Sequence, residues 1–174
     1  MRKRILLVIM LFVLCITGCA SKTVSTDKNG KTKKEFSINE TAIVNNTKIT
    51  INSVKKIYSE CSWEYEGKCY SSSEPDNAYF LLIDLTLENT GTEETNVSSI
   101  MQFELKMPNG EKASQELMLK SVKSSLDGSI MPNDLLKGQI AYDVSDEDYY
   151  YFYYQDGLLD DNIKFIINRS DISE

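Results

Sequence analysis

The sequence predicts an all-β fold, a two-sheet antiparallel β-sandwich of about seven strands. Three observations support this prediction. From residue 36 onward apolar and polar residues alternate with a period of two, no long stretch keeps the 3.6-residue period of a helix, and turn signals separate the apolar runs. Many short strands at such spacing are typical of a sandwich.

The strongest predicted strand covers residues 79–87, where alternate leucine and isoleucine side chains share one face. It ends at the turn signal Glu-Asn-Thr-Gly of residues 88–91. Asn109-Gly110 supplies the positive φ angles of a tight hairpin turn. Residues 115–123 fit a short helix and a loop equally well. The other expected strands cover residues 47–57, 101–107, 138–144, 149–154 and 162–167.

Residues 1–18 are predicted to be a signal peptide. A basic start, Met-Arg-Lys-Arg, precedes an apolar run over residues 5–16, which is shorter than the ~20 residues of a membrane-spanning helix. The run ends in Ile-Thr-Gly-Cys, which resembles the lipobox of bacterial lipoproteins. This resemblance implies that Cys19 begins the mature chain and carries a lipid such as palmitate, which anchors it on the outer face of the bacterial cell membrane. Ordinary secretion with cleavage after Ala20 is the alternative.

Residues 19–36 are predicted to be a flexible, disordered tether, and residues 37–174 the folded domain. The tether is rich in Ser, Thr, Lys and Asn and holds too few apolar residues to bury. The simplest role for it is a soluble spacer. Its lysines also suit contact with anionic lipid headgroups, at roughly 1 kcal/mol for each basic residue near the surface.

The composition limits the function. The formal net charge is −7, and removal of the signal peptide leaves 16 basic against 26 acidic residues, a net charge of about −10. The phosphate groups of nucleic acids repel a protein with this negative net charge, so we expect no nucleic-acid partner. The chain has no histidine, so it lacks the commonest general base and the commonest zinc ligand. We therefore expect no metal and no cofactor, and Ser–His or Cys–His catalysis is excluded.

Three blocks of sequence carry a family resemblance: residues 43–54, residues 79–92 with Phe103 and Asn109-Gly110, and residues 130–144. They are similar to the telokin-like, immunoglobulin-like domains of bacterial extracellular lipoproteins and secreted immunoprotective antigens. One departure is Asn133, which stands where the family places a glycine after the proline, although Asn also tolerates left-handed φ. The resemblance implies an immunoglobulin-like β-sandwich at the cell surface without enzyme activity.

Cys61 and Cys69 are the two other thiols of the mature chain, and outside the cytoplasm a disulfide between them is expected. A ring of this size stabilises by roughly 2.5 kcal/mol in the chain-entropy treatment. The loop displays Trp63 and Tyr65. Either Trp63 folds back onto the core, or the loop is a rigid aromatic recognition element. In the second interpretation Trp63 and Tyr65 are ligand-binding residues.

Residues 149–154 are six consecutive aromatic residues, Tyr-Tyr-Tyr-Phe-Tyr-Tyr. In a strand, one alternate row fills the core and the other lies on the outer face of its sheet. The outer row is either covered by neighbouring chain or forms a flat aromatic platform for a glycan or a protein. We name Tyr150 and Tyr154 as the ligand-binding residues of such a platform.

Asp143, Asp146, Glu147 and Asp148 form an acidic corner. Calcium prefers oxygen ligands, but the order of acids in the known calcium-binding loop is absent. A solvated turn accounts for these residues. We assign no metal ligands here, and calcium is kept as an open alternative.

The leading functional hypothesis is a non-catalytic binding or interaction module on the outer side of the membrane. Its partner would be an envelope protein, a host protein or a cell-wall glycan. The alternative is a structural lipoprotein that maintains the envelope. A glycosidase ranks last, because its two carboxylates must lie about 5–9.5 Å apart across a cleft, and sandwiches of this size rarely offer a deep cleft.

Overall fold

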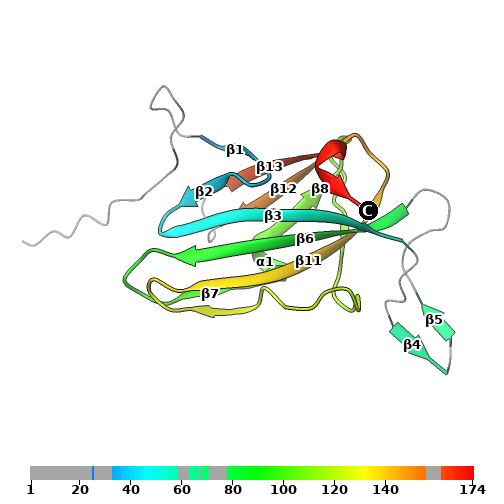
Figure 1. Ribbon diagram of the computed structural model, residues 1–174, viewed down its shortest axis with the longest axis horizontal. Helices are drawn as coiled ribbons and strands as arrows, with labels where there is room; N and C mark the ends of the chain where they lie inside the picture. The colour runs from blue at the N-terminus through cyan, green and yellow to red at the C-terminus, as the bar shows by residue number, and fades with distance from the viewer. Residues whose placement is uncertain (1–24, 26–32, 59–62, 67, 71–77, 156–161) are drawn as a thin grey trace, which may run out of the picture.

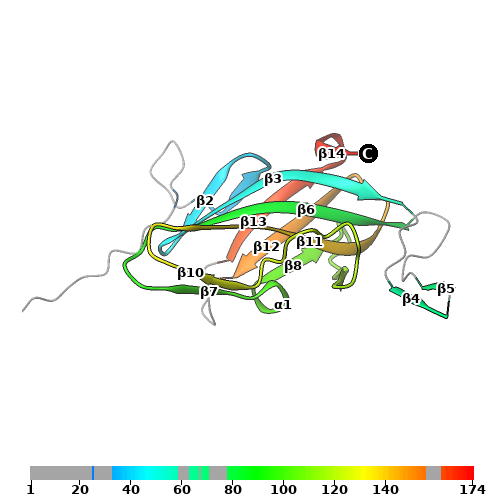
Figure 2. The same cartoon turned by 60° about the horizontal axis from the view of Figure 1, so that its bottom comes forward.

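Alternating apolar residues fold this chain into two stacked sheets (Figure 1). The computed structural model describes residues 25, 33–58, 63–66, 68–70, 78–155 and 162–174. Within these residues the long strands form two layers that pack face to face, as Figure 2 shows from a second direction. The predicted all-β sandwich is confirmed. The predicted signal peptide, residues 1–18, lies outside the described residues.

The larger sheet is built on three long antiparallel strands: β3 (Thr47–Ile57), β6 (Ala78–Asn89) and β11 (Leu135–Ser145). Short strands complete its edges, with β2 (Thr41–Val44) and β14 (Ile172–Ser173) beside β3 and β9 (Ser114–Glu116) beside β11.

The smaller sheet has the order β1-β13-β12-β8. Its strands are β1 (Glu35–Ser37), β8 (Phe103–Lys106), β12 (Tyr149–Gln155) and β13 (Asn162–Asn168). The chain passes from the larger to the smaller sheet at the corner between β11 and β12. Two small pairs and two helical turns complete the described elements: β7 (Thr95–Val97) with β10 (Gly128–Ile130), β4 (Trp63–Tyr65) with β5 (Lys68–Tyr70), α1 (Ser99–Gln102) and the 3-10 turn η1 (Arg169–Asp171).

The core lies between the two sheets. On β6 the predicted row is confirmed, since Leu81, Ile83, Leu85 and Leu87 are all fully buried. Opposite them, β12 and β13 contribute inward rows in which Phe152 and Phe165 are also fully buried. A second, smaller cluster covers the other face of β6, where Leu119 packs on Phe80 and Leu82.

A β-bulge in β3 changes which side chains face the core. The register with β6 shifts between Ile51 and Ser53. Ile49 and Ile51 are buried before the bulge, whereas Val54 is buried after it. The extra residue moves the inward set by one position, and Lys56 therefore also turns toward the interior end of the sandwich.

The structure moves the start of one expected strand and decides between the two alternatives for residues 115–123. The expected strand over residues 101–107 begins as the helical turn α1, and β8 starts only at Phe103. Residues 115–123 end β9 and continue as a loop. The first strand, β1, begins at Glu35 and pairs with β13, so the folded domain starts inside the segment predicted to be tether.

The Glu-Asn-Thr-Gly turn after β6 is held by a buried amide. Asn89 is fully buried, and its Nδ2 donates to the carbonyl oxygens of Glu93 and Ile130 at 2.7 and 2.9 Å. Its Oδ1 accepts from the N–H of Gly91 at 2.9 Å. A Cβ at Gly91 would lie 3.0 Å from Cβ of Asn46, so a larger residue there would have to displace Asn46 slightly. Asn133 takes the expected left-handed φ, +63°.

Tyr150 joins the two sheets at the β11–β12 corner. Its hydroxyl donates to the carbonyl oxygen of Ser145 at 2.6 Å and lies 2.5 Å from the hydroxyl of Tyr79 on β6. It also accepts the N–H of Glu147 at 3.1 Å. A tyrosine near the start of a strand that bonds to backbone a few residues upstream is the tyrosine corner of immunoglobulin-like sandwiches.

We predict that Tyr150→Phe destabilises the fold by about 1–3 kcal/mol, because it leaves the Ser145 carbonyl and the Tyr79 hydroxyl without this partner. Chemical denaturation measures the change. Tyr149→Phe, on the outward row of the same strand, is the control and is expected to stay within about 0.5 kcal/mol of wild type. Equal effects of the two substitutions would contradict a special role for the buried hydroxyl.

Candidate functional site

The outward aromatic row of β12 consists of Tyr149, Tyr151 and Tyr153, which are partly buried. Tyr150 and Tyr154 are fully buried. Naming them as residues of a surface platform was therefore wrong, because the alternation of the strand points the even-numbered row into the core. The sequence showed that two rows exist but not which one faces inward.

The outward row is not flat. The rings of Tyr149 and Tyr151 lie 5.1 Å apart and are tilted by 58°, and those of Tyr151 and Tyr153 lie 6.5 Å apart with the same tilt. Two lysines from the neighbouring strands lie over this row. Lys164 Nζ is 4.8 Å from the centre of the Tyr151 ring, and Lys106 Nζ is 4.9 Å from that of Tyr153. The outward tyrosines therefore do not form a flat platform. Their rings are tilted against one another, and a lysine lies over two of them.

A groove opens at the Tyr153 end of this row. Its volume is about 460 Å³, within the roughly 300–1,000 Å³ range of ligand sites. Two of its side chains, Ile100 and Met101 on α1, are 63% and 80% exposed. The groove is lined by Ile100, Met101, Gln102, Phe103, Glu104, Lys106, Lys112, Tyr153 and Gln155.

The charges in the groove centre on Glu104. Its carboxylate binds Lys106 Nζ at 2.7 Å and also contacts Lys112 Nζ. Burial by itself would raise the pKa of Glu104, but hydrogen bonds from the two lysines outweigh it and hold that pKa below its ordinary value. Glu104 therefore stays ionised, and the groove has one more positive than negative charge.

The position of α1 is fixed from a distant part of the chain. Asp127 accepts the backbone N–H of Ser99 at 2.8 Å and its hydroxyl at 2.8 Å. Ser125 donates to the same carboxylate at 2.6 Å. The hydrogen bond from Ser125 is the main reason why the pKa of Asp127 is lowered. This contact presents Ile100 and Met101 to solvent in a defined orientation.

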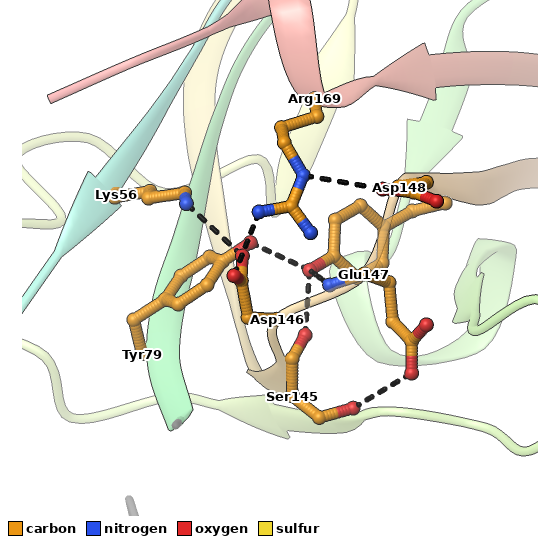
Figure 3. A network of polar contacts seen from close by, with 8 residues as sticks. Lys56, Tyr79, Ser145, Asp146, Glu147, Asp148 and Arg169 are labelled. Atoms are coloured by element: carbon orange, nitrogen blue, oxygen red, sulfur yellow. Dashed lines mark hydrogen bonds and ion pairs between the residues drawn. The ribbon is translucent and has the colours of Figure 1, made fainter. Parts of the chain in front are cut away.

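Two carboxylates of the acidic corner, Asp146 and Asp148, form ion pairs (Figure 3). Asp146 accepts from Arg169 Nη1 at 2.7 Å and from Lys56 Nζ at 3.1 Å. Arg169 Nε also lies 3.4 Å from Asp148. Lys56 Nζ is 4.5 Å from the centre of the Tyr79 ring. The carboxylate of Asp146 is thus occupied by two cations from β3 and η1, which accounts for this acid without calcium.

Among the residues that the structure describes, no group of three or more His, Cys, Asp or Glu side chains could hold a metal ion. Asp143, the first acid of the predicted corner, lies within β11. Glu147 accepts from the Ser145 hydroxyl at 3.2 Å.

The other candidate residues belong to the region between β3 and β6. Trp63 and Tyr65 form β4, which pairs with β5 so that Trp63 lies opposite Tyr70. Cys69 lies in β5 opposite Glu64, whereas Cys61 and Cys19 lie outside the described residues. The disulfide, the lipid on Cys19 and ligand binding by Trp63 and Tyr65 therefore stay predictions. The described part of the chain contains no helix long and apolar enough to cross a membrane.

Sequence reasoning missed the groove residues Ile100, Met101 and Lys112. A usable signal was present, because the apolar pair Ile100-Met101 interrupts the alternation between two short polar–apolar runs. The predicted Asn109-Gly110 hairpin turn brings Lys112 back along β8, but the ion pair of Lys112 with Glu104 was not predicted. The hairpin at Gly110, whose N–H donates to the carbonyl oxygen of Met107 at 2.9 Å, makes that contact.

We predict that the ion pairs of Asp146 stabilise the fold only while this carboxyl is ionised. Its hydrogen bond from Arg169 and that from Lys56 hold its folded-state pKa below the ordinary value of 3.8. A lowered folded-state pKa gives stabilisation that is present above pH ~4 and lost as the pH falls below it. The difference in unfolding free energy between wild type and Asp146→Asn is therefore expected to shrink between about pH 6 and about pH 3. A difference that does not depend on pH would contradict this assignment.

Comparison with solved structures supports the fold. The yjhA protein from Bacillus subtilis is 19% identical, with a TM-score of 0.59 over 76% of this chain and 98% of that one. A β-sandwich protein from Clostridium difficile 630 is 18% identical, with a TM-score of 0.50 over 83% of this chain and 99% of that one. The candidate lipoprotein ycdA from Bacillus subtilis is 21% identical, with a TM-score of 0.57 over 72% of this chain, which spans only 37% of ycdA.

No curated protein matches the sequence. One family profile does match it, over residues 36–164, which is most of the chain and nearly all of the sandwich. The match covers β3, β6, β11, β12 and the groove between α1, β8 and β12, and it ends within β13. The chain belongs to the DUF4352 family, a domain of unknown function.

Proposed function

We propose that this chain is a non-catalytic binding module, anchored on the outer face of the bacterial cell membrane by a lipid on Cys19. The groove between α1, β8 and β12 is its binding site. The structural similarity to ycdA, a candidate lipoprotein, supports the compartment. The tyrosine corner at Tyr150 supports the telokin-like, immunoglobulin-like subclass.

The observation that carries this proposal is the exposure of Ile100 and Met101 at the rim of a groove of about 460 Å³. Large apolar side chains grouped at one surface site mark interaction sites more often than scattered ones do. Methionine adapts its shape to a partner. The contact between Asp127 and Ser99 holds the helical turn in place before binding, which lowers the entropy cost of association.

The charge of the groove indicates the chemistry of the partner. Lys106 and Lys112 flank one carboxylate, Glu104, on a mature chain with a net charge of about −10. A partner with an apolar side chain next to an acidic one matches this site. We therefore propose a protein segment as the ligand. The single carboxylate of the groove lacks the second acid that a glycosidase needs.

Site-specific photocrosslinking in cells tests the binding site. A benzophenone amino acid at position 101 is expected to give a discrete protein adduct, and Tyr153→Ala should weaken that adduct several-fold because Tyr153 lines the same groove. Position 131 is the control, because Met131 is 57% exposed and lies outside the groove. Equal adducts at both positions, or an adduct with cell-wall glycan, would overturn the protein-binding site at the groove.

Metabolic labelling tests the anchor. The full-length chain is expected to incorporate labelled palmitate and to fractionate with membranes, because the thiol of Cys19 is the acylated group. Cys19→Ser should abolish both, whereas Cys69→Ser should leave both unchanged. Unlabelled wild-type protein in the medium would show ordinary secretion instead.

A further inference from the structure

Ser25, which lies in the segment predicted to be tether, contacts an edge of the larger sheet. Among the strands that the structure describes, β2 pairs with β3 and with no other. On its other side Ser25 bonds to both backbone groups of Ile43: the Ser25 N–H donates to the Ile43 carbonyl at 3.1 Å, and the Ile43 N–H donates to Ser25 Oγ at 2.7 Å. Ser25 thus occupies donors and acceptors that an edge strand otherwise leaves open.

A second contact holds the chain where it enters the domain. Lys33 Nζ binds the two oxygens of Glu40 at 2.8 and 2.9 Å and lies 4.8 Å from the centre of the Phe36 ring. Glu40 also accepts the backbone N–H of Ser37 at 2.8 Å. The Lys33 N–H donates to the Ser25 carbonyl at 2.8 Å. Ser25 and Lys33 are therefore held together beside β1 and β2.

From these contacts we infer that the tether fixes the orientation of the sandwich on the membrane. The end that carries Ile43 and the β2–β3 turn faces the lipid surface, and the end that carries the β4–β5 hairpin and the β11–β12 corner faces away. This inference rests on the proposed anchor at Cys19.

The geometric reason is the reach of the chain. Cys19 precedes Ser25 by six residues, which span at most about 20 Å when extended, whereas the sixteen residues from Cys19 to Glu35 span about 55 Å. While Ser25 is bound to β2, the six-residue link keeps this end of the domain within about 20 Å of Cys19. The reach of about 55 Å, which the sixteen-residue link would allow, is then not available. The eleven residues of β3 place its far end about 35 Å from the β2–β3 turn.

Tryptophans at two positions can report how far each end of the sandwich lies from the lipid surface. Thr92 is exposed in the β6–β7 turn, and the neighbouring Thr90 N–H donates to the Asn46 carbonyl of the β2–β3 turn at 2.7 Å. Trp63, the only tryptophan, belongs to the β4–β5 hairpin that follows the far end of β3 (Figure 1). A tryptophan at position 92 in a Trp63→Phe chain gives the matched probe for the near end.

Energy transfer to a labelled lipid measures the orientation. The mature chain with Cys61→Ser and Cys69→Ser is coupled through Cys19 to a maleimide lipid, in phosphatidylcholine–phosphatidylglycerol vesicles that contain a dansyl lipid. Transfer from position 92 is expected to exceed transfer from Trp63 by about threefold or more, given ~35 Å between the two ends.

Two variants of Ser25 test whether its contact sets this ratio. Ser25→Pro, which removes both the backbone N–H and the side-chain hydroxyl, should bring the ratio close to one, and Ser25→Thr should preserve it. Equal transfer from both positions in the wild-type chain would overturn the inference.

Amide exchange of the uncoupled mature chain tests the contact itself. Exchange at Ile43 is expected to be about three- to tenfold faster in Ser25→Pro, as for the loss of one hydrogen bond, and unchanged in Ser25→Thr. No change in either variant would overturn the contact. The lipid is attached chemically here, so a failed orientation and a failed natural acylation at Cys19 are distinguished.

Discussion

One side-chain row of β6 packs against one row of β12, and this contact between the sheets positions the other elements. Leu81, Ile83 and Phe152 are fully buried between the sheets, and most of the favourable free energy of folding comes from such burial. Strand alternation then fixes everything on the opposite faces. The outward tyrosines of β12 must lie on the surface, where lysines of β8 and β13 partly cover them.

The ends of the sandwich are closed by polar contacts instead. At one end the buried amide of Asn89 holds the turn after β6. At the other, the hydroxyl of Tyr150 and the ion pairs of Asp146 connect β3, β6, η1 and the β11–β12 corner. Because these groups satisfy one another, Asp146 has a structural role in the acidic corner. The proposed binding surface lies elsewhere, on the side of the smaller sheet, where α1 leaves Ile100 and Met101 uncovered.

The groove and the predicted tether are the two parts on which the proposed binding module rests. Asp127 holds α1 from a segment 28 residues away, so the apolar rim of the groove is preformed. Ser25 bonds to β2, and Lys33 bonds to Glu40 beside β1 and β2. In the proposed arrangement a short link from Cys19 sets the end that faces the lipid, and the side of the smaller sheet stays accessible to a partner.

The fold class and the long strands could be predicted from the residues alone, because alternation and turn residues are local properties of the chain. The buried row of β6, from Leu81 to Leu87, and the Asn109-Gly110 turn needed no tertiary information. Three features could not be predicted in this way: which tyrosine row of β12 is buried, that Lys56 and Arg169 meet at Asp146, and that Ile100 and Met101 stay exposed. These outcomes depend on contacts between segments far apart in the chain, and a pattern with a period of two is symmetric with respect to the two faces of a strand.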